Sequence, residues 1–339
     1  MTEPSNENPL TDWRALHADF FSGSRCLITG GAGFIGSHLT RTLVTLGAEV
    51  SVLDDLSGGD RENLAGLLGD HSSKVDFHEG SICEPERVRD AMRGAEFVFH
   101  LAALGSVPRS ITMPAVYADV NVGGTMTVLE SARDLNVKRL VFASSSSVYG
   151  ETPELPKHEA MPMLALSPYA ASKVAGEAMV RAYAKCYEMD SACLRYFNVF
   201  GPRQNANSAY AAVIAAFAKA LASGQPPAIY DDGEQSRDFT YVDNVVHANL
   251  QAVRSAEDLN GAAMNVACGR SVTVNELAKQ MMVAYGHPNL DVEYRQARKG
   301  DIRHSLAALD RAKEMIGYDP IVGFEAGLNE TMRWARSVG

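Results

Sequence analysis

The sequence predicts an α/β fold in which a doubly wound parallel sheet is covered by helices on both faces. Three observations predict it. Apolar runs alternate with helical patterns between residues 25 and 196. These runs show little polar alternation, as is typical of strands that are buried on both faces. The first run also leads directly into a glycine-rich turn and then into a helix. We expect right-handed crossovers between successive strands.

The elements follow in order along the chain. Strands are expected at residues 25–29, 49–53, 74–79, 96–101, 138–143 and 190–196. Helices are expected between them, near residues 34–46, 85–93, 116–135 and 169–187.

After Gly201 the composition shifts to Asn, Pro, Gly and short Ala-rich stretches. The Ala-rich run 208–222 is expected to be a packed helix, because it is short and carries Lys219. We therefore expect an N-terminal extension over 1–22, which packs on the surface or stays mobile. A nucleotide-binding domain over 23–200 follows, to which 240–275 returns, and a smaller mixed α/β lobe covers 201–339.

Composition narrows the function classes. The formal net charge of −10 argues against nucleic acid as a partner, because phosphate backbones need a positive surface. The five cysteines are scattered without a CxxC pair, which predicts reduced thiols and neither a disulfide framework nor a metal site. No apolar run approaches the length of a membrane span, and the polar N-terminus does not resemble a signal peptide. We expect a cytoplasmic protein that binds no membrane.

The segment 26–36 reads Cys-Leu-Ile-Thr-Gly-Gly-Ala-Gly-Phe-Ile-Gly, and Gly31, Gly33 and Gly36 fit the pattern G-x-G-x-x-G. In that fingerprint the first glycine permits a sharp turn, the second lets backbone approach a pyrophosphate, and the third lets the helix pack closely on the sheet. The N-terminus of the helix then binds phosphate charge. The pattern predicts a dinucleotide site in preference to an ordinary turn.

The second strand ends at Asp54, about 20 residues further on, where an acid binds the adenine ribose hydroxyls. Asp55 follows, and no Arg is adjacent. Because these carboxylates would repel a ribose phosphate, the pair favours NAD over NADP.

A candidate catalytic group lies after the fifth strand. Tyr169 and Lys173 are four residues apart, so a helix places them on one face, and the serines 144–147 stand at the strand end. Ligands of doubly wound sheets bind beyond the carboxyl ends of the strands. The lysine and a nicotinamide ring are expected to lower the pKa of Tyr169 from about 10, so that it takes a proton from a sugar hydroxyl. Ser145 is the expected catalytic hydroxyl, although one or two of the four serines can serve only as a polar junction.

With these motifs the chain resembles the extended short-chain dehydrogenase/reductase family, and within it the nucleotide-sugar 4-epimerases, above all those acting on UDP-N-acetylglucosamine and UDP-N-acetylgalactosamine. The resemblance covers roughly residues 23–336. It rests on seven segments or residues: 29–36, 100–103, Asn121, the Ser145/Tyr169/Lys173 set, 195–198, 237–239 and 300–305.

The resemblance implies a Rossmann domain that holds NAD. The cofactor contacts expected from it and from the motifs are Gly30, Gly33, Phe34, Ile35, Asp54, Asp55, Ser81, Ile82, Leu101, Ala102, Ala103, Asn121, Tyr169, Lys173 and Tyr196. His100 is expected to be a satisfied histidine at a strand end, and Asn121 to support the nearby helix.

The resemblance also implies that the smaller lobe binds a UDP-sugar. The expected substrate contacts are Ser106, Arg109, Ser145, Ser146, Ser147, Asn198, Ala212, Val213, Tyr230, Arg237, Arg298, Asp301 and Ser305. Among them, Asn198 is expected to bind the diphosphate, the two arginines 237 and 298 to neutralise it, and Asp301 to accept from a ribose hydroxyl. A homodimer through the helices 116–135 and 169–187 is implied as well.

The expected reaction is reversible epimerisation at C4 of the sugar, through a 4-keto sugar and tightly bound NAD. Ser146 and Ser147 stand where related dehydratases and decarboxylases carry acids, so elimination is disfavoured. Ser305 replaces the bulky aromatic of galactose-restricted relatives and leaves room for an N-acetyl group. The alternatives are a UDP-glucuronate 4-epimerase, a decarboxylase or a dehydratase on the same scaffold, and an NAD-binding regulator without chemistry.

Overall fold

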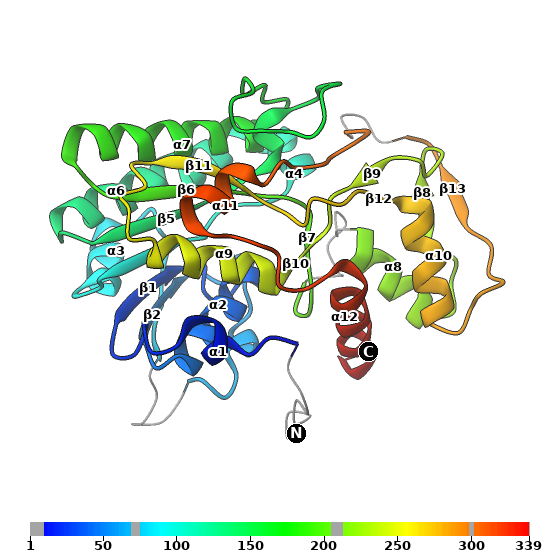
Figure 1. Ribbon diagram of the computed structural model, residues 1–339, viewed down its shortest axis with the longest axis horizontal. Helices are drawn as coiled ribbons and strands as arrows, with labels where there is room; N and C mark the ends of the chain where they lie inside the picture. The colour runs from blue at the N-terminus through cyan, green and yellow to red at the C-terminus, as the bar shows by residue number, and fades with distance from the viewer. Residues whose placement is uncertain (1–9, 69–74, 205–212, 298–301, 339) are drawn as a thin grey trace.

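A seven-stranded sheet forms the centre of the molecule (Figure 1). The computed structural model describes residues 10–68, 75–204, 213–297 and 302–338. The strand order is β11-β6-β5-β4-β1-β2-β3, and every pairing in the sheet is parallel. The strands are β1 (Arg25–Thr29), β2 (Glu49–Asp54), β3 (Val75–Glu79), β4 (Phe97–His100), β5 (Arg139–Ser145), β6 (Ser191–Tyr196) and β11 (Ala262–Val266). The predicted doubly wound parallel sheet is confirmed, and its direction of winding reverses between β1 and β4.

Helices cover both faces of the sheet, as the unalternating apolar strands predict. Successive residues of β1 point into different cores: Cys26 and Ile28 into one, Leu27 into the other. The first core is covered by α2 (Phe34–Thr45), α9 (Val242–Arg254) and α11 (Asp310–Ile316), and the second by α3 (Pro85–Met92), α6 (Gly124–Asp134) and α7 (Pro168–Tyr187).

The helix expected near 116–135 is interrupted by a change of pitch. It starts as α5 (Pro114–Tyr117), continues as the π-helical turn η2 (Ala118–Gly123) and ends as α6. The π-helical turn lies beside α7. Such turns often occur at functional sites.

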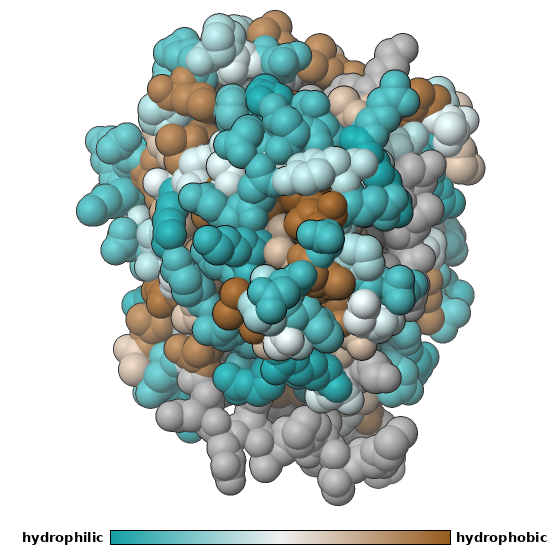
Figure 2. All heavy atoms as spheres, turned by 90° about the vertical axis from the view of Figure 1, so that its right-hand side faces the viewer, coloured by the Kyte–Doolittle hydropathy of each residue, from teal (hydrophilic) through white to brown (hydrophobic). Residues whose placement is uncertain are grey.

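The smaller lobe lies at one end of the sheet, on the right in Figure 1. Its helices are α8 (Val213–Ala222), α10 (Val274–Ala284) and α12 (Phe324–Val338). Its strands are short and paired two by two: β7 (Val199–Phe200) with β10 (Thr240–Tyr241), β9 (Ser236–Arg237) with β12 (Val272–Thr273), and β8 (Ala228–Tyr230) with β13 (Glu293–Arg295). In α8, the helical part of the Ala-rich run, Ile214, Phe217 and Leu221 are buried, so this helix is packed as expected. The solvent side of the lobe is mostly hydrophilic, with scattered apolar side chains (Figure 2).

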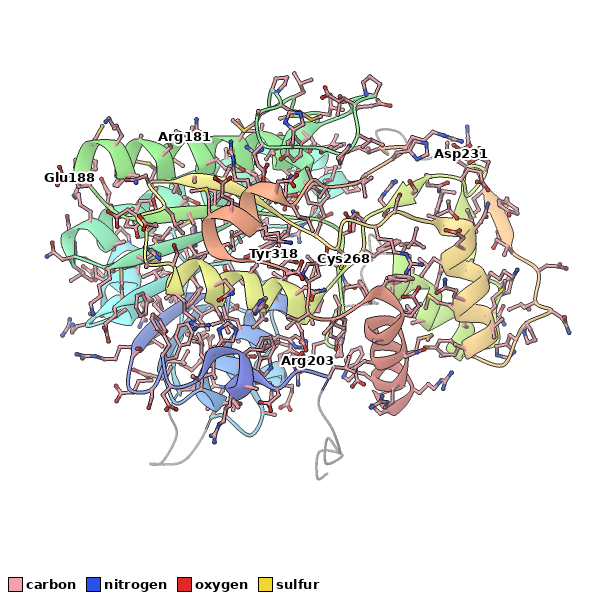
Figure 3. The ribbon with its side chains drawn as sticks, in the orientation of Figure 1. Arg181, Glu188, Arg203, Asp231, Cys268 and Tyr318 are labelled. Carbon is pink, nitrogen blue, oxygen red and sulfur yellow. The ribbon has the colours of Figure 1, made fainter. Side chains whose placement is uncertain are left out.

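Two short α-helices and two 3-10 turns complete the described elements: α1 (Trp13–His17) and α4 (Val107–Thr112), and η1 (Arg61–Leu64) and η3 (Ser146–Tyr149). Polar side-chain contacts also join the sheet to the segments that follow its helices. Tyr318, just after α11, donates a hydrogen bond of 2.8 Å to the carbonyl of Ala267 beyond β11, close to Cys268 (Figure 3). None of the helices in the described ranges combines the length and apolarity of a membrane span.

The described part of the N-terminal segment is fastened to α9. Thr11 Oγ1 donates to Asp243 Oδ2 over 2.7 Å, and His17 Nε2 lies 3.1 Å from His247 Nδ1. Arg254 Nη1 donates to the carbonyl of Leu16 over 3.1 Å. Since α9 starts directly after β10 of the smaller lobe and packs on the sheet, this segment fastens the element that joins the two regions.

Candidate active site

The glycine-rich turn joins β1 to α2 at the carboxyl edge of the sheet. Gly30 has φ +73°, so the sharp turn falls on Gly30 and the prediction that Gly31 provides it was wrong. Gly31 instead makes room for Val52, which would lie 2.7 Å from a Cβ there. The close-packing role of Gly36 is confirmed, because its Cβ would lie 2.1 Å from the carbonyl oxygen of Gly30.

A cavity of about 380 Å³ runs along this edge from the glycine turn to α7. Of the expected cofactor contacts, thirteen line it: Gly30, Gly33, Phe34, Ile35, Asp54, Asp55, Ile82, Leu101, Ala102, Ala103, Tyr169, Lys173 and Tyr196. Ser81 and Asn121 lie outside its wall. Ser81 Oγ accepts from the amide of Cys83, next to the start of α3.

The residues of this cavity fit a dinucleotide. Gly33 is the N-cap of the twelve-residue helix α2 and carries no side chain to bind the first amides, which remain available to a phosphate. A Cβ at Gly30 would lie 2.8 Å from the amide nitrogen of Ala102, so backbone alone forms this wall. The loop 57–59 was missed by the sequence analysis, although its Ser-Gly-Gly after two acids is a signal for close backbone approach.

Asp54 ends β2 in the wall of the cavity. Its Oδ2 accepts from the amide of Ala32 and its Oδ1 from the amide of Leu56, each over 2.9 Å. Burial raises the pKa of this carboxyl, and the two amide hydrogen bonds oppose the rise. The carboxylate therefore ties the glycine turn to the end of β2, and its contact with a ribose stays a prediction.

Tyr169 and Lys173 lie in the first turns of α7, which Ser167 caps by accepting from the amide of Ala170. Lys173 Nζ donates to the carbonyl of Ala143 over 2.8 Å and lies 6.0 Å from the centre of the Tyr169 ring. Only 4% of Lys173 is exposed, and burial lowers its pKa to about 8. The spacing thus brings the phenol and the amine together on one face, as predicted.

The predicted fall in the pKa of Tyr169 does not occur in the protein chain by itself. Burial raises this pKa, and a hydrogen bond with Ser145 only partly opposes the rise. The expectation left out the loss of water around the phenol, and a fall in this pKa when the nicotinamide ring is bound stays a prediction.

The four serines divide into two groups. Ser145 Oγ accepts from the amide of Ser147 over 3.2 Å and bonds its hydroxyl over 3.0 Å, at the start of η3. Ser144 also lines the cavity, but its hydroxyl is buried and donates to Glu177 on α7. Ser144 is therefore a junction residue, while Ser145 reaches Tyr169.

His100 and Asn121 support this region, as expected. His100 is 1% exposed, and its ring nitrogens pair with the hydroxyls of Thr29 (2.7 Å) and Thr125 (3.0 Å). Burial lowers its pKa to about 3, so the ring is neutral.

Asn121, in η2, accepts from the amide of Leu104 (2.8 Å) and donates to Ser172 Oγ (2.9 Å). Ser172 in turn donates to the carbonyl of Tyr169 (2.7 Å). The amide thus braces the first turn of α7 against the loop after β4.

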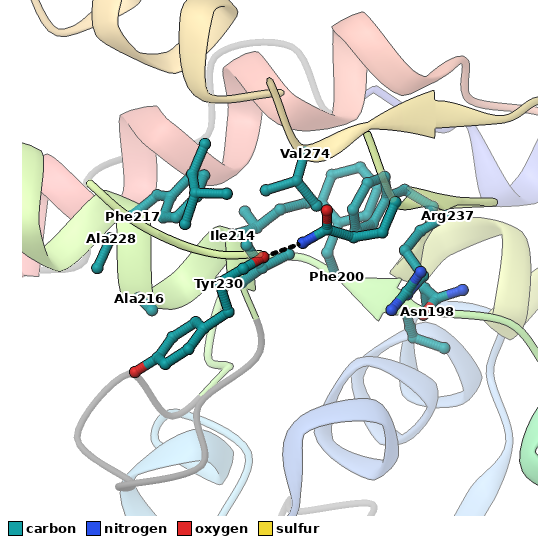
Figure 4. A pocket seen from close by; sticks show the side chains of 14 residues that line it. Asn198, Phe200, Ile214, Ala216, Phe217, Ala228, Tyr230, Arg237 and Val274 are labelled. Carbon is teal, nitrogen blue, oxygen red and sulfur yellow. Dashed lines mark hydrogen bonds between the residues drawn. The ribbon is translucent and has the colours of Figure 1, made fainter. Parts of the chain in front are cut away.

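A second cavity, of about 250 Å³, lies in the smaller lobe (Figure 4). Four expected substrate contacts line it: Asn198, Val213, Tyr230 and Arg237. Phe200, Ile214 and Phe217 supply much of the remaining wall. Arg237 Nη1 donates to the carbonyls of Ser236 (3.0 Å) and Arg303 (3.1 Å), which hold its guanidinium beside Asn198.

Other expected substrate contacts lie elsewhere. Ser106, Arg109, Ser145, Ser146, Ser147 and Ser305 do not line this cavity. Ser106 caps α4, and Ser305 is buried with its amide bonded to the carbonyl of Ser236 over 3.0 Å. Ala212, Arg298 and Asp301 lie outside the described residues.

Gln235 lines the second cavity and was missed by the sequence analysis. It is 7% exposed, and its Nε2 donates to the carbonyl of Tyr230 over 2.6 Å (dashed line in Figure 4). Its Oε1 is buried and has no hydrogen-bond partner among the described residues. A buried acceptor of this kind costs free energy until a donor meets it.

Comparisons with known proteins agree with this geometry. A family model, "NAD dependent epimerase/dehydratase family", matches residues 26–267. A UDP-glucose 4-epimerase of Mycolicibacterium smegmatis is 39% identical over 315 residues, which are 92% of this chain and 99% of the relative.

Solved structures match the whole architecture. UDP-N-acetylglucosamine 4-epimerase from Methanobrevibacter ruminantium, in complex with UDP-N-acetylmuramic acid, is 38% identical with a TM-score of 0.88, over 94% of this chain and 100% of that one. UDP-glucose 4-epimerase of Thermus thermophilus, in complex with NAD, is 35% identical with a TM-score of 0.83, over 93% and 100%. The chain therefore belongs to the NAD dependent epimerase/dehydratase family and is an enzyme whose cofactor is NAD.

Proposed function

We propose that the chain is a UDP-sugar 4-epimerase that interconverts UDP-N-acetylglucosamine and UDP-N-acetylgalactosamine, with UDP-glucose and UDP-galactose as secondary substrates. One observation carries the proposal: Tyr169 and Lys173 line the same cavity as the glycine turn, at its far end. The relatives named as UDP-sugar 4-epimerases, matched over nearly their full length, support the reaction class.

In this proposal Tyr169 takes the proton from the C4 hydroxyl and later returns it to the 4-keto sugar. NAD, when bound, accepts the hydride from C4 and gives it back to the opposite face of the sugar. Ser145 holds the phenol by a hydrogen bond, and Lys173 supplies the nearby positive charge that favours the phenolate. Because burial raises the pKa of Tyr169, this positive charge is needed for proton transfer near neutral pH.

The cavity of the smaller lobe fits the nucleotide of a UDP-sugar. Its aromatic and aliphatic wall suits a flat base, and Arg237 and Asn198 at its edge suit a diphosphate. The unused acceptor Gln235 Oε1 suits the N3–H donor of uracil. Arg298 and Asp301 complete the proposed contacts from a segment outside the described residues.

Three serine side chains bear on the choice of reaction and of sugar. Positions 146 and 147 carry hydroxyls, so this junction offers no carboxylate for eliminating water or CO₂. Ser305 is small and is held next to the strand of Arg237, where a larger side chain would reduce the room for a C2 substituent. The relative from Methanobrevibacter ruminantium, a UDP-N-acetylglucosamine 4-epimerase, supports the N-acetyl preference.

The test is to incubate the purified protein with UDP-N-acetylglucosamine or with UDP-glucose, adding no NAD, and to resolve the products by proton NMR. We expect UDP-N-acetylgalactosamine to form, and to form faster than UDP-galactose. Deuterium placed at C4 should stay in the sugar. Release of water would select a dehydratase, loss of CO₂ in a parallel incubation with UDP-glucuronate would select a decarboxylase, and nucleotide binding without any product would select a regulator.

A further inference from the structure

A buried ionic cluster lies directly behind the proposed catalytic lysine. Glu177, 1% exposed, accepts from Arg195 Nε over 2.8 Å and from Arg195 Nη2 over 2.7 Å. Its Oε1 also accepts from Ser144 Oγ over 2.5 Å. Arg195 lies 4.8 Å from the ring centre of Tyr149, and its Nη1 is buried without a partner among the described residues.

The strand register of the sheet places this cluster one helical turn after Lys173 on α7. Lys173 and Glu177 occupy successive turns of α7 on one face. The successive β5 residues Ala143 and Ser144 bind them, the first through its carbonyl and the second through its hydroxyl. Arg195 is the direct partner of Ser144 across the β5–β6 pair, so both reach the same carboxylate.

Several elements place titratable groups around Lys173, and among them the Glu177 carboxylate contributes most to its ammonium form. Burial opposes that form, and Cys193 on β6 is a neutral thiol because burial raises its pKa well above the usual value. His100 on β4 is neutral, and Tyr169 on α7 is protonated in the chain alone. Of the Glu177–Arg195 pair, Glu177 is the member whose charge acts on Lys173.

We propose that Glu177, held in place by Ser144 and Arg195, is a positioning residue that keeps the Lys173 ammonium charged and directed at Ala143 and Tyr169. This inference rests on the proposed epimerase function for its catalytic consequence. The other reading is that the ion pair only joins α7 to the sheet, and buried ion pairs of that kind can be replaced by apolar residues with little loss of stability.

The experiment compares three variants with the wild-type holoenzyme: Glu177→Gln, the double variant Glu177→Met with Arg195→Met, and the charge-conserving Glu177→Asp. The double variant leaves no uncompensated buried charge, so it remains testable if Glu177→Gln does not fold. An exposed pair on α3 and α6, replaced as Arg89→Met with Asp134→Leu, is the control for loss of an ion pair elsewhere.

Two measurements are made between pH 6 and 10. The first is the pH profile of kcat and KM for UDP-N-acetylglucosamine. The second is the rate of Lys173 modification by an amine reagent, followed by peptide mass spectrometry. In Glu177→Gln and in the double variant we expect the basic limb of kcat and the midpoint of labelling to move down by about one pH unit, the low end for loss of a close opposite charge. KM should change less than about twofold, because this charge acts on the chemical step. Glu177→Asp and the control should keep the wild-type midpoints.

A folded double variant with the wild-type labelling midpoint would overturn the inference. So would a shift of the same size in the control. Absence of epimerisation in the wild type would overturn the proposed function alone, because the labelling midpoint of Lys173 does not depend on turnover.

Discussion

The proposed catalytic centre and the proposed nucleotide pocket are built in different ways. The catalytic groups stand on long regular elements, the seven-residue strand β5 and the twenty-residue helix α7, joined by buried polar contacts. The nucleotide pocket stands on paired strands of two or three residues, on loops, and on the ten-residue helix α8, which supplies part of its apolar wall.

This difference means that the side chains of the two sites are held in position in different ways. At the catalytic edge, every side chain that we place in the chemistry is held by a partner from another element, so its position depends on the whole sheet. We propose that single side chains decide which groups fit the pocket, Gln235 in its wall and Ser305 next to the strand of Arg237. Changes at the catalytic edge should therefore affect kcat, and changes in the pocket should affect KM and the choice of sugar.

The largest expected effect tests the catalytic side of this contrast. Tyr169→Phe removes the proton acceptor but keeps the ring, so turnover should fall by about 10²- to 10⁴-fold while NAD content and KM stay near wild type. Turnover is measured by NMR, and NAD by absorbance of the supernatant after denaturation. Unchanged turnover would remove Tyr169 from the mechanism.

The next largest effect concerns the sugar. Ser305→Tyr should lower kcat/KM for UDP-N-acetylglucosamine by about 10- to 200-fold more than for UDP-glucose, because the added ring takes the volume of the N-acetyl group. Kinetics with both substrates give the ratio. Equal loss on the two substrates would mean that Ser305 does not set the sugar preference.

A smaller effect is expected for binding of the uracil base of the substrate. Gln235→Leu removes an acceptor that is unpaired among the described residues, so KM for the UDP-sugar should rise about 3- to 10-fold at constant kcat. The matched control is Gln204→Leu, since Gln204 also donates to a backbone carbonyl and, within the described part of the chain, has a buried, unpaired Oε1, but lies outside the pocket wall. If Gln235→Leu and Gln204→Leu raise KM equally, Gln235 has no particular role in binding the base.

The smallest effect tests the attachment of the N-terminal segment to α9, between the two regions. Burial, with the neighbouring charges of the cluster, lowers the pKa of His17 to about 3, and burial with the charge of Arg254 lowers that of His247 to about 4. The unfolded chain binds protons at these groups below about pH 6.5, whereas the folded chain does not. The contribution of these two histidines to stability should therefore be constant above pH 6.5 and fall as the pH drops towards 4.

Urea unfolding at pH 7.5 and pH 5.5 measures this effect. His17→Leu should show a smaller difference between the two pH values than the wild type, because one of the two histidines no longer titrates on unfolding. An unchanged difference would mean that other groups cause the acid sensitivity.

Six of the seven strands and the helices between them could be predicted because their signals are local and repeated, whereas β11, α9 and α11, which join the sheet from later in the chain, were not singled out. Apolar strands buried on both faces, a glycine turn and the Tyr169–Lys173 spacing each depend on residues close in sequence. The two-residue strands of the smaller lobe leave no such periodicity. They form because partners far apart in sequence meet, as Ser236 and His304 do.

The misses have the same origin. The assignment of the sharp turn to Gly31 failed because two adjacent glycines fit the pattern and only backbone geometry distinguishes them. The pKa of Tyr169 depends on how much water the fold removes, which spacing does not show. Gln235 could not be singled out because its unpaired oxygen, unpaired among the described residues, exists only after the lobe has folded around it.

The change of pitch before α6 has a consequence for the tolerated length of the chain. Tyr117, on one side of η2, bonds the backbone of Ser106, and Thr125, on the other side, bonds His100. Deleting one residue within 118–123 would restore a regular α-helix and leave the two anchors facing as they do, because a π-helical turn holds about one residue more than an α-helical turn. Deleting a residue elsewhere between the anchors, without a change of pitch, would rotate one anchor against the other by about 100°. Single-residue deletions should therefore be tolerated within 118–123 better than elsewhere in this helix.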